Sequence, residues 1–153
     1  MKIYFTPIDE IEQFVVSEEG QSKLSELKEY YIRLDSIFQK LYDLPVKLTP
    51  EAMKTYLDFG HLDIELHSFL LTSGLLPFYD WESWLEGKDI IDGLKKSPSL
   101  SQVKALKLLS LVVNLDFREK GRFDDFLKSG QMLWLLEFLI VQNSKVTVKS
   151  ESA

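Results

Sequence analysis

Cysteine is absent from this sequence of 153 residues, and several kinds of chemistry are absent with it. A disulfide framework, a thiol nucleophile, and zinc or iron–sulfur sites with cysteine ligands are all excluded. Histidine is nearly absent too, since only His61 and His67 occur. Six residues separate them, which places them on nearly opposite sides of a regular helix. A zinc motif of the H-E-x-x-H type needs both imidazoles on one face, so we expect helix-surface pairs instead, His61 with Glu65 and Asp63 with His67.

Long apolar runs are also missing. The most apolar stretch, Met132 to Val141, covers ten residues and includes Glu137. A helix that crosses a bilayer needs about 20 apolar residues, so this stretch predicts a buried core helix. The first residues lack the apolar run of a signal peptide. We therefore expect no membrane association and a cytoplasmic location.

Basic charge is scarce, because the formal net charge is −6 at pH 7. A protein that binds nucleic acid needs clusters of lysine and arginine to neutralise phosphates, so nucleic acid is not an expected partner. Glycine and proline are few, at 7 and 5 residues, and 45% of the residues are apolar. This composition is typical of one globular domain. We expect a single helical domain over residues 1–142 and a flexible C-terminal tail over 143–153.

Apolar residues recur at helical spacing along most of the chain, which predicts an all-α fold. We expect an irregular or orthogonal bundle of about six helices. The residue ranges are about 8–18, 22–43, 50–59 continuing as 61–72, 81–93 or 81–95, 100–117 and 122–142.

Glycine and proline predict where these helices end. The expected ends are at Gly20, Pro45 and Gly74, with a kink or an end at Gly60. Ser97-Pro98-Ser99 predicts a break between helices, and Gly130 a bend. The expected N-caps are Thr49 before Pro50, Asp80 before Trp81, and Ser99 in a capping box with Gln102.

The helices over 100–117 and 122–142 are apolar nearly all round, so we expect them at the centre of the core. The narrow polar strip of the first contains Lys104, Lys107, Ser110 and Asn114, and we interpret it as a solvated face. The helix over 22–43 carries a regular apolar stripe, from Leu24 to Leu41. Such a stripe fits a dimer seam or core packing, and its length of fewer than three heptads favours the core.

The segment from Phe78 to Trp84 holds two of the three tryptophans. One interpretation is a binding surface, since tryptophan and tyrosine are enriched at binding hot spots. The other is that Trp81 and Trp84 anchor a short helix on the core, and this second interpretation is favoured.

Two of the three arginines, Arg118 and Arg122, lie in a charged segment between the two most apolar helices. Their guanidinium groups are suited to clamp a phosphate or a carboxylate ligand. The favoured alternative is an internal network, because acidic partners are plentiful nearby, namely Asp116, Glu119, Asp124 and Asp125.

Sequence motifs for catalysis are missing. No G-x-S-x-G, P-loop, G-x-G-x-x-G or kinase pattern occurs, and the carboxylates are scattered. We therefore assign no catalytic, cofactor-binding or metal-binding residue and expect no cofactor.

The C-terminal half nevertheless resembles a family of small uncharacterised bacterial proteins, a domain of unknown function. The shared features are Asp80-Trp81 with Trp84, a leucine-rich helix over 103–115, Arg122-Phe123, Gly130, and a closing apolar helix that ends near Leu136. The chain departs from the family pattern where Asp124-Asp125-Phe126 replaces a small residue. The family has no established activity, so the resemblance implies only that Trp81, Arg122 and Phe123 are candidate functional residues.

These observations favour a non-enzymatic protein-interaction or regulatory module of a bacterial cell, for example in defence or toxin immunity. We expect a protein partner and a chain that is a monomer or a weak homodimer. The alternative is a small-molecule-binding or catalytic domain with a pocket between Trp81 and Trp84 on one side and Arg118 and Arg122 on the other. The candidate binding surface comprises Tyr79, Asp80, Trp81, Trp84, Arg118, Arg122 and Phe123.

Overall fold

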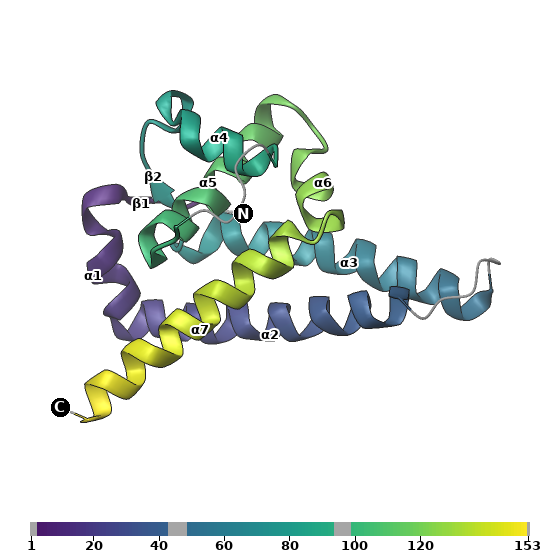
Figure 1. Ribbon diagram of the computed structural model, residues 1–153, viewed down its shortest axis with the longest axis horizontal. Coiled ribbons are helices and arrows are strands. Elements are labelled where there is room, and N and C mark those ends of the chain that lie inside the picture. The colour runs from purple at the N-terminus through teal and green to yellow at the C-terminus, as the bar shows by residue number, and fades with distance from the viewer. Residues whose placement is uncertain (1–2, 43–48, 94–98, 153) are drawn as a thin grey trace.

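The computed structural model of the protein describes residues 3–42, 49–93 and 99–152, and in these residues the predicted all-α fold is confirmed. Seven α-helices pack together in this part of the chain (Figure 1). They are α1 (Ile11–Val16), α2 (Glu18–Tyr42), α3 (Pro50–Ser73), α4 (Leu85–Ile91), α5 (Gln102–Arg118), α6 (Arg122–Lys128) and α7 (Gln131–Ser152). Two short 3-10 helices, η1 (Ile8–Glu10) and η2 (Trp81–Ser83), and two strands, β1 (Thr6–Pro7) and β2 (Pro77–Phe78), complete the list.

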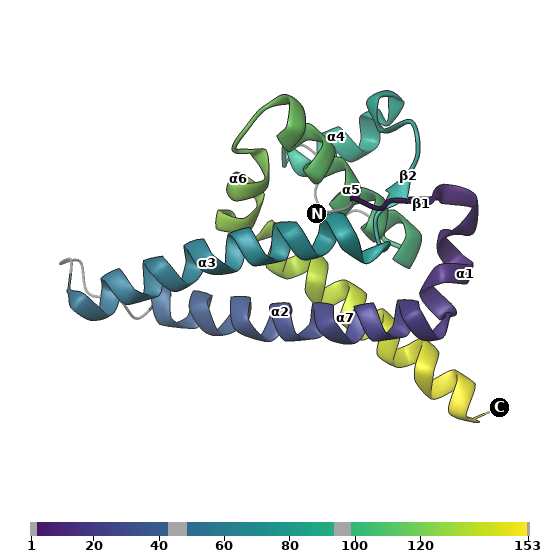
Figure 2. The same cartoon turned by 180° about the vertical axis from the view of Figure 1, so that it is seen from behind.

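The two longest helices, α2 and α3, run antiparallel and side by side along one side of the molecule (Figures 1 and 2). Helix α7 crosses α2 obliquely on one face of this pair. Helix α5 contacts α4, α6 and α7, which places it at the centre of the remaining helices. The architecture is therefore an irregular bundle, in agreement with the prediction.

The core follows the apolar patterns of the sequence. Helix α5 buries residues on nearly every side, including Leu106, Leu109 and Val112, as expected for a helix that is apolar nearly all round. The stripe of α2 is also buried, with Leu24, Leu27 and Leu34 at 3% exposure or less. Because α3 and α7 cover this stripe, it belongs to the core and forms no dimer seam.

Helix α3 begins and ends where the sequence predicts. The Ala52 N–H donates to the Thr49 hydroxyl at 3.1 Å, and Gly74 follows the last turn with a φ of +81°. A positive φ is strained for other residues, so glycine suits this C-terminal position. The helix passes through Gly60, so of the two outcomes predicted there, a kink or an end, the end is wrong.

The first predicted helix ends earlier than Gly20. Its last residue is Val16, because the backbone of Ser17 is extended and a second helix begins at Glu18. The Ser17 hydroxyl accepts the Gly20 N–H at 3.1 Å and so caps α2. Gly20 therefore lies inside α2, and its predicted role as a terminator is wrong.

Two predicted N-caps are also wrong. The Asp80 carboxylate accepts the Ser83 hydroxyl at 2.6 Å and caps no backbone N–H, and the helix breaks at Trp84. Ser101 replaces Ser99 as the cap of α5, with its hydroxyl 3.1 Å from the Lys104 nitrogen. The second error is a shift of two residues within a serine-rich stretch, where several side chains are able to cap.

The last predicted helix is divided at Gly130, whose φ is +88°, into α6 and α7. Helix α7 continues to Ser152, so the backbone of the predicted tail is helical that far. The predictions for Pro45, Lys95, Ser97 and Pro98 lie outside the described residues.

The N-terminal segment joins the body through a small parallel sheet. Thr6 pairs with Pro77 and Pro7 with Phe78. The Thr6 hydroxyl donates to the Gly74 carbonyl at 2.5 Å, and the Tyr4 N–H donates to the Leu71 carbonyl at 2.8 Å. This pairing holds η1 beside the segment that leads into η2.

Within the part of the chain that the structure describes, no helix combines the length and the apolar composition needed to cross a membrane.

Candidate functional site

The segment from Pro77 to Trp84 lies over the polar strip of α5, so this strip is not the solvated face that the sequence predicts. The buried Ser110 hydroxyl donates to the Pro77 carbonyl at 2.8 Å, and the Tyr79 hydroxyl donates to the Lys107 carbonyl at 2.7 Å. The Asn114 amide donates to the Ser110 carbonyl at 2.8 Å. Ser110 is the fully buried member of the strip and needs such a partner, which the backbone of the crossing segment supplies.

Lys107 lies against two aromatic rings of the same segment. Its ammonium is 4.2 Å from the centroid of a Trp84 ring and 4.9 Å from that of Tyr79, and the two aromatic side chains meet edge to face. Burial lowers the pKa of Lys107, although Glu86 opposes this shift, and burial raises the pKa of Tyr79. The cation–π contacts stabilise the position of both rings.

The Trp84 ring also packs directly against the backbone of Gly87. A Cβ at the buried Gly87 would lie 2.3 Å from the Trp84 ring, so a larger residue would displace the indole. The ring is half-buried and packs against the core. Trp84 therefore acts as the predicted core anchor.

Trp81 has a different environment. It is half-buried, and the Arg118 guanidinium carbon lies 4.9 Å from the centroid of its ring. The same guanidinium forms an ion pair of 2.7 Å with Glu82. Arg118 thus bridges α5 and η2, and its carboxylate partner comes from the aromatic segment rather than from the nearby acids that the sequence suggests.

Beside Trp81 the surface is hollowed into an open groove of about 540 Å³, which we call the aromatic groove. The Phe78 side chain lies in it with 67% of its surface exposed. One wall comes from the N-terminal segment and the other from the residues around η2. The lining residues are Pro7, Ile8, Asp9, Phe78, Tyr79, Asp80, Trp81 and Glu82.

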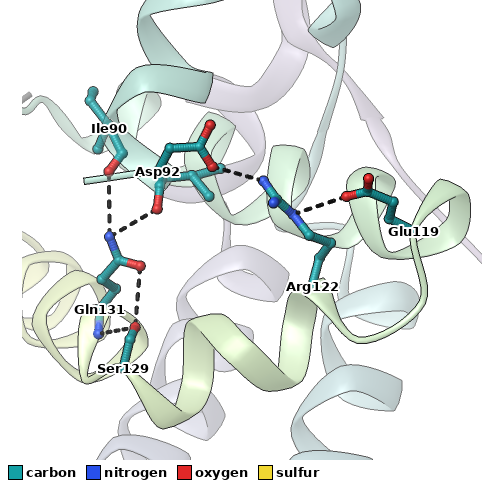
Figure 3. A network of polar contacts seen from close by, with 7 residues as sticks. Ile90, Asp92, Glu119, Arg122, Ser129 and Gln131 are labelled. Carbon is teal, nitrogen blue, oxygen red and sulfur yellow. Dashed lines mark hydrogen bonds and ion pairs between the residues drawn. The ribbon is translucent and has the colours of Figure 1, made fainter. Parts of the chain in front are cut away.

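Arg122 lies in a separate polar network (Figure 3). Its guanidinium reaches Asp92 at 3.1 Å and Glu119 at 3.7 Å. Next to it the Gln131 amide donates to the Ile91 carbonyl at 3.1 Å. The network joins the residues after α4 to the starts of α6 and α7, beside a hollow of about 180 Å³. The internal network that the sequence favoured for Arg122 is confirmed, with Asp92 as a partner that the sequence did not suggest.

Most of the other acids near Arg122 have different partners. Asp116 accepts the N–H groups of Gly121 at 3.0 Å and Phe123 at 3.1 Å, so it stabilises the start of α6. The Asp124 carboxylate forms an ion pair of 2.7 Å with Lys128. These carboxylates therefore stabilise the turn after α5 and helix α6.

Phe123 belongs to the core and not to a surface, because it is 2% exposed. Its ring stacks on His67 with the ring centroids 4.6 Å apart. Burial lowers the pKa of His67, and Asp116 partly opposes this shift. The predicted surface pair of His67 with Asp63 is therefore wrong, since the imidazole packs on a buried ring.

Asp63 pairs instead with a second carboxyl group. Burial and a hydrogen bond with Asp124 raise the pKa of Asp63 to about 7. Burial also raises the pKa of Asp124, but hydrogen bonds from Asp63 and Lys128 outweigh this and lower it. This hydrogen bond links α3 to α6. Among the described residues, no group of three or more acidic or histidine side chains could hold a metal ion.

The structure thus brings together Tyr79, Asp80, Trp81, Trp84 and Arg118, and it separates Arg122 and Phe123 from them. Sequence reasoning missed the contributions of Phe78 and Lys107, and those of the N-terminal residues Ile8 and Asp9. Phe78 carried a usable indication, because it begins the aromatic segment that one interpretation treats as a binding surface. The N-terminal wall carried none, since it depends on a contact between residues about 70 positions apart.

No protein family, curated protein or solved structure matches this chain. The resemblance of the C-terminal half to small bacterial proteins therefore remains a prediction.

Proposed function

We propose that the protein is a non-enzymatic interaction module, and that its aromatic groove binds a short segment of a partner protein. The observation that carries this proposal is the exposure of Phe78, at 67%, beside the half-buried ring of Trp81. Large aromatic side chains that remain accessible on a hollowed surface are the usual anchors of protein interfaces.

The charges around the groove define the chemistry of the partner. The carboxylates of Asp9, Asp80 and Glu82 line it, and Arg118 neutralises only Glu82. A segment with lysine or arginine beside a large apolar side chain fits this arrangement, because the apolar group packs on the rings while the cations meet the carboxylates. An acidic segment would be repelled.

The groove is held in shape before a partner arrives. Trp84 and Tyr79 are fixed by Lys107, and Pro77 is fixed by Ser110. A preorganised surface loses less conformational entropy on binding, so even a short segment binds measurably.

The alternative of a small-molecule or catalytic site is less well supported. It requires guanidinium groups that are available to a ligand. Arg118 instead pairs with Glu82, and Arg122 pairs with Asp92 in a separate cluster. The cytoplasmic location and the bacterial regulatory or defence role expected from the sequence belong to the present proposal and are open to cell fractionation and gene deletion.

Selection of random peptides displayed on phage against the wild-type protein tests the proposal. Enriched peptides are then synthesised and titrated against the protein by isothermal calorimetry. The variants are Phe78→Ser and Trp81→Ala, and the matched control is Val16→Ser, which removes an exposed apolar side chain from α1 outside the groove. Circular dichroism establishes that all variants are folded.

We expect the enriched peptides to combine a large apolar residue with lysine or arginine. Removal of Phe78 or Trp81 should weaken binding by about tenfold or more, which corresponds to the loss of one hot-spot side chain. Removing two carboxylate charges from the groove lining with Asp9→Asn and Asp80→Asn should weaken peptide binding at low salt and have less effect at high salt. Acidic peptides, or equal binding by wild type and both groove variants, would refute the proposal.

A further inference from the structure

The outer face of α3 carries a second apolar surface, which we call the α3 stripe: Met53, Leu57, Gly60 and Ile64. The three large side chains are 50%, 62% and 71% exposed. Their spacing of four, three and four residues places them in one line on the helix, as in the seam of a coiled coil. Figure 2 shows α3 along the front of the molecule, and in that view no other helix crosses in front of it.

The stripe is distinct from the face that α3 uses in the fold. The buried side of α3 contains Thr55, Leu62 and Leu66 and lies on the opposite side of the helix. Tyr56, 57% exposed, adds to the outer surface. A line of large apolar side chains that the monomer leaves in water is a feature of an interface.

The charged residues along one flank of the stripe are complementary to the same flank of a second α3 helix that runs in the opposite direction. In chain order the flank carries Lys54, Asp58, His61 and Glu65. Suppose that two α3 helices pack antiparallel about a twofold axis near Gly60, so that each residue faces the one equally far from Gly60 in the other direction. To within one position along the helix, Lys54 then faces Glu65 of the second copy, and Asp58 faces His61 of the second copy.

The same arrangement matches the remaining groups. Leu57 faces Ile64 of the second copy, and on the other flank the Tyr56 hydroxyl faces Asp63. Glu65 already forms an ion pair of 2.5 Å with Arg33, and both side chains are about half exposed, so a second cation can approach the carboxylate. A parallel arrangement about a twofold axis along the helices would place this flank against the opposite flank of the second copy, so the pairs of Lys54 with Glu65 and of Asp58 with His61 would be lost.

Gly60 suits the centre of such a contact. A Cβ at this position would meet nothing within 4 Å, so the fold of a single chain gives no reason for glycine here. Glycine is also a poor helix former. Where two copies of Gly60 face each other at the axis, the missing side chains allow the two helix backbones to approach closely.

We propose that the α3 stripe is a homodimer interface, in which two copies of the chain pack their α3 helices antiparallel about a twofold axis at Gly60. The proposal is independent of the aromatic groove. One helix from each copy gives an interface at the small end of the range for specific complexes, so the dimer is weak and forms at micromolar concentrations.

The absence of cysteine makes the register directly testable. Gly60→Cys should form a disulfide-linked dimer under mild oxidation, because the two copies of residue 60 meet at the axis. Met53→Cys, on the same stripe, should stay monomeric on a non-reducing gel, because its two copies lie roughly 20 Å apart along the helices. Equal cross-linking of both variants, or none above the level of a denatured control, would overturn the proposal.

Sedimentation velocity over about 1 to 300 µM tests the association without a covalent bond, a range chosen for weak complexes. Wild type should shift towards dimer with concentration, and Leu57→Glu should raise the dissociation constant at least tenfold. The matched control is Leu85→Glu, since Leu85 is comparably exposed but lies on α4, and it should behave as wild type. A wild type that stays monomeric throughout, or equal effects of the two substitutions, would refute the homodimer and leave the stripe to a different partner. Circular dichroism checks the fold of each variant.

Discussion

Alanine in place of Gly20 should destabilise the protein, although the same substitution at Gly60 should stabilise it. Both glycines lie inside long helices, Gly20 in α2 and Gly60 in α3. Alanine is the better helix former by up to about 1 kcal/mol, so propensity alone predicts a gain at both positions. The two sites differ in the space around the missing side chain.

At Gly20 a Cβ would lie 1.9 Å from the carbonyl oxygen of Phe14 and 2.9 Å from the Cα of Val15. Both atoms belong to the backbone of α1, so no side-chain rotation relieves the overlap. The corner between α1 and α2 must open by more than an ångström. This disturbs the Ser17 cap and the hydrogen bond of 2.8 Å that the Gln21 side-chain amide donates to the Val15 carbonyl. Forced overpacking of this kind costs about 1–3 kcal/mol and occasionally more, which exceeds the gain in propensity.

The propensity gain is common to both variants, so they should differ by the overpacking cost of about 1–3 kcal/mol in the free energy of unfolding, with Gly20→Ala below wild type and Gly60→Ala above it. Urea denaturation followed by circular dichroism at 222 nm measures this difference. The protein should be kept dilute, so that any dimer through α3 is dissociated and does not contribute. A Gly20→Ala variant as stable as wild type would refute the close approach of the two helices.

Three further predictions concern the polar groups that join the helices. Ser110→Ala should lower the free energy of unfolding by about 1–3 kcal/mol, because the Pro77 carbonyl loses its buried donor; urea denaturation checks this. Asp63 has a folded-state pKa of about 7 against an ordinary value of 3.8, so the folded state binds its proton more tightly and stability should fall as the pH rises from about 4 to about 7. Asp63→Asn should flatten this slope in urea titrations across that range, and an unchanged slope would contradict the assignment. Arg122→Gln should cost no more than about 1 kcal/mol in thermal unfolding, because its ion pair with Asp92 is partly exposed; a loss of several kcal/mol would mean that the network is far more important to the fold.

Local sequence patterns were sufficient for the elements of this fold. The all-α class, the buried stripe of α2 and the Thr49 and Gly74 ends of α3 follow from spacing and capping chemistry, which act over a few residues. The errors at Gly20 and Ser99 are also local. In both cases a nearby serine caps the helix, and several adjacent polar residues would serve equally well in the sequence.

The candidate site was only partly predictable. The tryptophans of the cluster around Trp81 are rare and conspicuous in the sequence, whereas Arg122 joins the candidate surface as a possible anion clamp and Phe123 through the resemblance to a bacterial family. Neighbouring residues on a helix point in different directions, so Phe123 enters the core while Arg122 faces Asp92. Lys107 was interpreted as solvated because its own helix says nothing about what covers it.

The sequence by itself determined that this chain forms amphipathic helices and helices that are apolar nearly all round, with a core of leucine and phenylalanine, because burial and helix periodicity are properties of the residues and their spacing. The tertiary structure alone decided which surfaces remain open. Thr6 pairs with Pro77, which builds the second wall of the aromatic groove. Helix α2 packs against one side of α3, while the α3 stripe faces water. Such contacts join residues far apart in the chain, and their free energy depends on the shapes of packed surfaces that no local pattern encodes.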